Sequence, residues 1–189
     1  MTTARPYADA RNAPSLRADL LLALALIGLC VAMRLLPQVS NFSPVAAAAL
    51  FAGAVLGRRW LALLVPIAAM LIGDLALGFY DGRVMAVVYA ALALPALIGM
   101  MARNGRPWFI AIGGALTASL IFYLTTNLAV WAFGGQYKFD MAGLIQCYIA
   151  ALPFLKYTVA GDLFWSVALF GGALLLRAQS RPAKAALQP

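Results

Sequence analysis

The sequence predicts an all-α, multi-pass membrane protein: a bundle of six transmembrane helices with both termini in the cytoplasm. Of its 189 residues 65% are hydrophobic and 11% charged, and the mean hydropathy is +0.90, so lipid is the expected solvent. Long apolar runs follow one another, and Lys and Arg gather in alternate gaps between them. Polar, basic stretches at 1–17 and 178–189 are expected to be disordered cytoplasmic tails, which leaves 18–177 as the transmembrane domain.

The first two apolar runs differ in length. Residues 20–36 can span a bilayer, and no A-x-A cleavage site follows them, which indicates a retained helix rather than a signal peptide. Residues 44–57 form only about 21 Å of helix against a hydrocarbon core of about 30 Å. Asn41 or Ser43 can cap this short helix, and Pro44 suits its first turn. A helix that begins at membrane depth needs partners for its free N–H groups, so its N-terminus is a candidate ligand contact.

Four further apolar runs are long enough to span: 60–79, 84–101, 108–133 and 157–176. Between the last two, residues 141–154 are too short and too polar to span a bilayer, and Pro153 is expected to end them. We therefore expect them to form a separate short helix in the membrane interface.

The basic residues orient the chain. With six spans and a cytoplasmic N-terminus, ten of the fourteen Lys and Arg residues fall on the cytoplasmic side, as the positive-inside rule requires. These ten are Arg5, Arg11, Arg17, Arg58, Arg59, Arg103, Arg106, Arg177, Arg181 and Lys184. The outer side receives Arg34, Arg83, Lys138 and Lys156.

The composition excludes several kinds of function. His and Glu are absent, and Cys30 and Cys147 are too far apart for a CxxC motif, which removes the common metal, haem and Ser-His-Asp arrangements. The net charge of +8 is scattered beside apolar runs rather than gathered in a stripe, so no nucleic acid is expected. There is no GxxxxGK[ST] loop for ATP. We expect a protein without enzymatic activity, cofactor or bound metal, whose surroundings are the lipid bilayer.

Three polar residues lie inside apolar helices near the outer side: Asp74, Asn127 and Asp162. An intramembrane carboxylate costs about 2.5–3.5 kcal/mol on insertion scales, so such groups usually face the bundle interior or a cavity. They could contact a solute, or either Asp could pair with Arg34 or Lys156 and only hold helices together.

Aromatic and sulfur-containing residues gather at the same side. Trp131 and Tyr148 suit either an interfacial aromatic belt or a cover over a ligand. Cys147 could ligate a soft metal centre carried by a solute, or simply pack. The residues expected to bind substrate are thus Asn41, Ser43, Asp74, Asn127, Trp131, Cys147, Tyr148 and Asp162.

Several segments together carry a family resemblance: Asn-Phe-Ser-Pro-Val at 41–45, Ala-Met-Leu-Ile-Gly-Asp-Leu at 69–75, Thr-Asn at 126–127, Cys-Tyr-Ile-Ala-Ala at 147–151 and Gly-Asp-Leu at 161–163. Over about 40–175 the chain resembles a bacterial family of small membrane proteins named only as candidate transport proteins. That family is similar in size and topology to the substrate-binding S components of energy-coupling-factor vitamin transporters. The resemblance implies a vitamin-like ligand, held by Asn41, Asp74, Asn127, Tyr148 and Asp162.

The function expected from this reasoning is uptake of a small polar or vitamin-like solute across the bacterial inner membrane, with an energising ATPase module as a possible partner. One alternative is a non-transporting scaffold or assembly protein whose buried Asp residues are structural. Another is a membrane enzyme that uses Asp74 and Asp162, which would have to lie within about 5–10 Å of each other.

Overall fold

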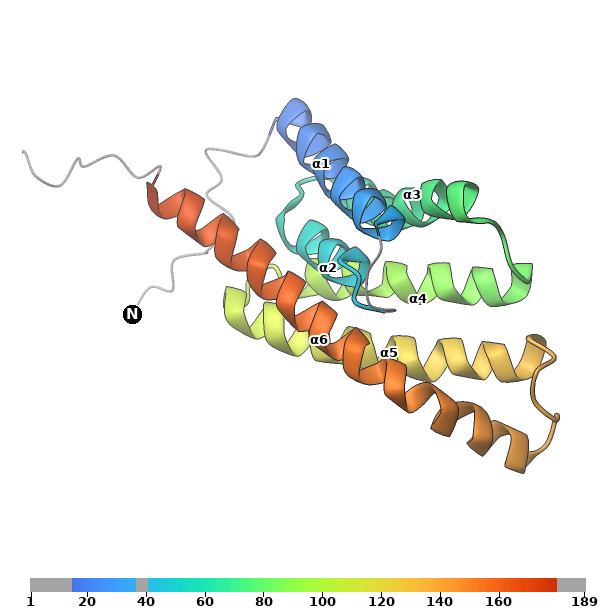
Figure 1. The fold of residues 1–189 in the computed structure, drawn as a ribbon. Helices are drawn as coiled ribbons and strands as arrows, with labels where there is room; N and C mark the ends of the chain where they lie inside the picture. Colours follow the sequence, from blue (N-terminus) through green and yellow to red (C-terminus); the bar gives the residue numbers. More distant parts are fainter. Residues whose placement is uncertain (1–14, 37–40, 180–189) are drawn as a thin grey trace, which may run out of the picture.

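The computed structural model describes residues 15–36 and 41–179, and within them the chain forms six α-helices and no β-strand (Figure 1). The helices are α1 (Leu16–Leu35), α2 (Val45–Val55), α3 (Arg59–Leu77), α4 (Gly82–Met101), α5 (Pro107–Phe133) and α6 (Met141–Gln179). All except α2 are long and apolar enough to cross a membrane. Most of the two expected tails lies outside the described residues, although α1 and α6 reach slightly into them, to Leu16 and Gln179.

The last helix differs from its prediction. Residues 141–154 are not a separate interfacial helix, because they form the first part of α6, which continues without a break for 39 residues. Pro153 lies inside this helix. A proline removes a single backbone hydrogen bond, and transmembrane helices tolerate that loss. At about 1.5 Å per residue α6 is about 58 Å long, nearly twice the hydrocarbon thickness.

The short helix α2 lies at the centre of the bundle. All its residues from Val45 to Ala54 are buried, and it packs against each of the other helices. At about 16 Å it is too short to span a bilayer by itself. Small residues permit this burial: a Cβ on Gly53 would overlap the backbone of Ala96, and a Cβ on Gly99 would overlap the carbonyl of Leu50. The helices α2 and α4 are therefore in backbone contact.

Arginines and one aspartate fasten one end of the bundle. We call it the basic end; α1, α3 and α5 begin there and α2, α4 and α6 end there (Figure 1). The carboxylate of Asp19 accepts from the backbone N–H groups of Gly57 (3.3 Å) and Arg58 (3.2 Å) and from the Arg58 guanidinium (3.1 Å). Arg103 donates to the carbonyls of Gly53 and Leu56 at the end of α2, which have no partner within that helix.

Candidate functional site

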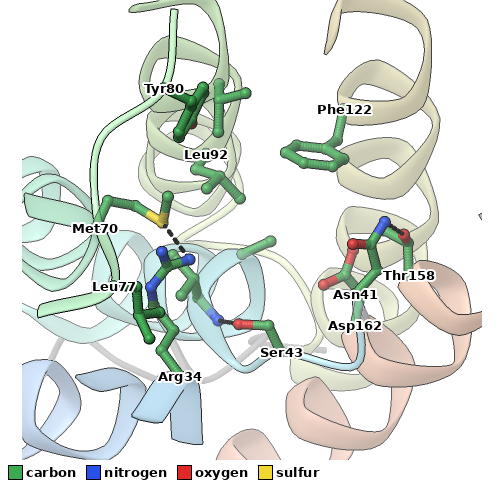
Figure 2. A pocket seen from close by; sticks show the side chains of 13 residues that line it. Arg34, Asn41, Ser43, Met70, Leu77, Tyr80, Leu92, Phe122, Thr158 and Asp162 are labelled. Atoms are coloured by element: carbon green, nitrogen blue, oxygen red, sulfur yellow. Dashed lines mark hydrogen bonds between the residues drawn. The ribbon is translucent and has the colours of Figure 1, made fainter. Parts of the chain in front are cut away.

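A cavity of about 310 Å³ opens toward the other end of the bundle, and we call it the main cavity (Figure 2). Leu77 and Tyr80 line it and are 60% and 43% exposed, so the cavity reaches the surface there. All six helices or the loops beside them contribute to its wall. The lining residues are Arg34, Asn41, Ser43, Val45, Ala46, Met70, Leu77, Tyr80, Val88, Leu92, Phe122, Thr158 and Asp162.

Arg34, on α1, forms one side of the main cavity. Its Nη2 lies 2.5 Å from Oδ1 of Asp74, and the hydroxyl of Tyr89 donates to Oδ2 of the same carboxylate (2.7 Å). Nη1 of Arg34 donates to the sulfur of Met70 at 3.3 Å, as Figure 2 shows. Gly73 makes room for this arrangement, because a Cβ there would overlap Nε of Arg34. Asp74 thus lies behind Arg34 and is not among the residues that line the cavity.

Asp162, on α6, lies on the opposite side of the main cavity from Arg34 (Figure 2). Its side chain is buried, and Oδ2 accepts a hydrogen bond from the hydroxyl of Ser119 on α5 at 2.6 Å. Among the described residues, Asp162 has no basic partner: the ion pairs there join Arg34 to Asp74, Arg58 to Asp19 and Arg83 to Asp81. Lys156 lies over the ring of Tyr157 instead, 4.8 Å from its centroid.

The two buried carboxylates expected near the outer side therefore share no hydrogen-bond partner. Asp74 bonds to Arg34 and Tyr89, whereas Asp162 bonds to Ser119. Asp74 matches the helix-pairing alternative raised by the sequence, and Asp162 remains a cavity residue.

Further polar groups line the main cavity beside Asp162 and at the start of α2. Asn41, which has a positive φ of 66°, donates from Nδ2 to the hydroxyl of Thr158 at 3.3 Å, close to Asp162 (Figure 2). The hydroxyl of Ser43 accepts from the N–H of Val45 (3.4 Å), but the N-cap residue of α2 is Pro44, so neither Asn41 nor Ser43 caps this helix as the sequence predicted. Since Val45 and Ala46 line the cavity, the N-terminus of α2 faces it.

Tyr80 adds a hydroxyl at the exposed rim of the main cavity. Burial, assisted by the negative charge of Asp74, raises the pKa of its phenol. A phenol is protonated at neutral pH even without such a shift, so the hydroxyl can act as a hydrogen-bond donor.

A second hollow of about 240 Å³ lies between α5 and α6. It shares Asn41, Phe122 and Thr158 with the main cavity, so the two adjoin. Asn127 lines this second hollow, but its Nδ2 donates to the carbonyl of Tyr123 (2.8 Å) in its own helix.

Three expected site residues hold the α5–α6 hairpin together, and none lines either hollow. Trp131 donates to the carbonyl of Lys138 at 3.0 Å. The sulfur of Cys147, which is 2% exposed, lies 3.4 Å from the carbonyl of Asn127. The hydroxyl of Tyr148 donates to the carbonyl of Leu124 at 2.6 Å. In the described part of the chain no three His, Cys, Asp or Glu side chains cluster as a metal site would require.

Several cavity residues were not on the list expected from the sequence, notably Met70, Tyr80, Phe122 and Thr158. Helical spacing could have identified two of them. Thr158 precedes Asp162 by four residues and Met70 precedes Asp74 by four, which places each pair on one helix face. Tyr80 and Phe122 carry no such signal.

The chain belongs to a family of unknown function, DUF6580, whose match covers residues 14–185. No curated protein and no solved structure matches the chain.

Proposed function

We propose that this protein is an uptake protein of the bacterial inner membrane, similar to the S components of vitamin transporters. It binds a small polar or vitamin-like solute in the main cavity and carries it inward. The observation on which this proposal depends is the cavity itself, which has Arg34 on one side and Asp162 on the other. Its volume of about 310 Å³ is in the range of small-molecule sites.

The placement of charge supports an outward-facing cavity. Arg58, Arg59, Arg103 and Arg106 lie at or beside the basic end, and positive charge favours the cytoplasmic side. The main cavity then opens outward and both termini lie in the cytoplasm. Fusions of alkaline phosphatase after residues 80 and 104 test this orientation: activity is expected only after residue 80, and the reverse pattern contradicts the proposal.

Release on the inner side requires the helices to rearrange, because α2 and the Asp19 and Arg103 contacts close the basic end. The chain has no ATP-binding loop, so we propose that an ATPase module supplies the energy. The exposed small residues Gly28 and Ala32 on α1 offer a surface on which a helix of such a partner could pack closely.

Mass spectrometry of small molecules that co-purify with the gently extracted protein tests solute capture. We expect a recurrent mass with the unmodified protein and with Asp81→Ala, which alters an exposed loop carboxylate. The mass should be lost with Asp162→Ala. If no solute recurs, and cells that overproduce the protein accumulate none, the uptake proposal is wrong.

A second candidate is a non-transporting scaffold. The observation in its favour is Asp74, whose two oxygens are both occupied by Arg34 and Tyr89 within the protein. A scaffold predicts that Asp162→Ala, like changes at Asp74, reduces folding and has no separate effect on any bound solute.

A further inference from the structure

We infer that the solute is a small organic cation, whose positively charged nitrogen binds Asp162 and whose far end carries a hydrogen-bond acceptor for Arg34. This inference rests on the uptake function proposed above and names the chemical class of its solute. Its basis is the unequal pairing of the charges around the main cavity.

The acidic side of the cavity has an unpaired carboxylate. Arg34 is already bound to Asp74, so these two charges cancel. Asp162 then remains as the acidic group without an opposite charge among the described residues that line the main cavity. A buried carboxylate without a counter-charge is costly in a low-dielectric site. An ammonium, amidinium or iminium group supplies that charge from the solute.

Hydrogen bonding leaves Asp162 with room for such a group. Ser119 binds Oδ2, and among the described residues it is the only hydrogen-bond partner of the carboxylate. Asn41 and Thr158 lie beside it and offer further polar atoms (Figure 2). The ring of Phe122, also on the cavity wall, can lie against a cation or against an apolar part of the solute.

The opposite side offers hydrogen-bond donors. Nη1 of Arg34 donates to the thioether of Met70, which is a weak acceptor. An oxygen of the solute is a stronger acceptor than the sulfur and can replace it. The N-terminus of α2, at Val45 and Ala46, favours the same electron-rich group. Val88 and Leu92 add apolar side chains to the cavity wall.

Three probes with one carbon skeleton test these requirements on the full-length protein in lipid nanodiscs. 6-Aminohexanamide has both the ammonium and the acceptor, hexanamide lacks the ammonium, and hexylamine lacks the acceptor. By calorimetry we expect 6-aminohexanamide to bind at least about tenfold more tightly than either of the others, since a hydrogen bond to a charged group is worth about that much. Equal binding of hexanamide and 6-aminohexanamide, or no binding by any probe, overturns the inference.

Two variants test which residue binds each end of the solute. Asp162→Asn keeps a side chain that can accept from Ser119 but removes the charge, and should weaken 6-aminohexanamide at least about tenfold while leaving hexanamide unchanged. The double variant Arg34→Gln, Asp74→Asn removes a neutral pair, and should weaken 6-aminohexanamide and hexanamide but not hexylamine. Asp81→Asn is the control and should bind like the unmodified protein. An Asp162→Asn protein that folds and binds 6-aminohexanamide normally contradicts the inference.

Failure of this inference can be told apart from failure of uptake. If a co-purifying solute is lost in Asp162→Ala but is neutral or anionic at pH 7, uptake stands and the cation assignment is wrong. If no solute co-purifies and none is accumulated by cells, uptake itself is wrong.

Discussion

The buried aspartates at the basic end and in the wall of the main cavity have very different surroundings. At the basic end, Asp19 accepts three hydrogen bonds from Gly57 and Arg58, and the one from the Arg58 guanidinium is also an ion pair. In the wall of the main cavity, Asp162 accepts one hydrogen bond from the described residues, that of Ser119, and lies against open space. Both carboxylates are nearly inaccessible, at 2% and 4% exposure, so burial does not distinguish them. Their partners do.

The difference separates a structural carboxylate from one with capacity left for a ligand. Asp19 fixes the junction where α2 ends and α3 begins, and both of its carboxylate oxygens are hydrogen-bonded within the protein. Burial of the Asp162 carboxyl costs free energy, and its one hydrogen bond to Ser119 offsets little of that cost. A membrane protein that retains such a group in a cavity wall usually uses it for a solute or an ion.

Asp74 lies between these extremes. Its own oxygens are bound by Arg34 and Tyr89, but the arginine that pairs with it still faces the cavity with a donor directed at sulfur. The aspartate is therefore structural, whereas its partner is available to a ligand. Arg34 therefore belongs both to the structural ion pair and to the cavity wall.

Arg34→Gln should produce the largest loss of stability. It leaves Asp74 buried without a counter-charge, which costs about 3–5 kcal/mol when one member of a buried pair is removed. The double variant with Asp74→Asn should recover most of that loss. Thermal unfolding in detergent measures both, and a double variant no more stable than the single one would show that Arg34 does not act through Asp74.

Asp19→Ala should have the next largest effect. It removes the acceptor of two backbone N–H groups and the partner of Arg58. Because the Arg58 side chain is 37% exposed, water can solvate it, and the expected loss is about 1–3 kcal/mol. Solute binding by the folded fraction should be normal, which circular dichroism together with the probe titration can establish. A selective loss of binding would mean that the two ends of the bundle are not independent.

Hydropathy alone predicted most of the helical architecture, although six transmembrane helices were expected and only five of the described helices are long and apolar enough to span a membrane. The expected runs at 60–79, 84–101 and 108–133 agree within a few residues with α3, α4 and α5. The break expected near Pro153 is wrong, because the sequence does not show whether neighbouring helices support a proline inside a membrane helix.

The site was only partly predictable. Asn41, Ser43 and Asp162, which the sequence singled out as candidates for substrate binding, line the main cavity, since polar residues among apolar ones are conspicuous. The sequence could not say which Asp pairs with Arg34, because that depends on the placement of α1 against α3. Nor could it show that Cys147 and Tyr148 bond to backbone carbonyls of α5, a matter of side-chain direction at one helix contact.

Asp162→Asn sharpens the contrast with Asp19 because its effect on stability should have the opposite sign. An amide can still accept from Ser119 and no longer carries a buried, unpaired charge, so the empty protein should be as stable as before or up to about 1 kcal/mol more stable. Unfolding of solute-free protein at neutral pH measures this. A loss as large as that of Asp19→Ala would place Asp162 among the structural carboxylates.

Asp81 is the exposed aspartate in this comparison, and Asp81→Asn should have the smallest effect on stability. It caps α4 by accepting from the N–H groups of Arg83 (3.0 Å) and Val84 (3.1 Å), and it pairs with the Arg83 guanidinium at 3.2 Å. The hydrogen bond from the Arg83 side chain, followed by that from the Val84 N–H, lowers the pKa of the carboxyl from its usual 3.8.

A carboxyl whose pKa is lowered by folding stabilises the native state above its unfolded pKa, and that contribution disappears as the pH falls through the folded value. Asp81→Asn should therefore reduce the melting temperature slightly at pH 7, and the difference from the unmodified protein should fade below about pH 3.8. Melting curves of both proteins across this range provide the measurement. A difference that persists in acid would mean that the cap acts through its shape rather than its charge, in which case charge pairing would explain the buried aspartates but not the exposed one.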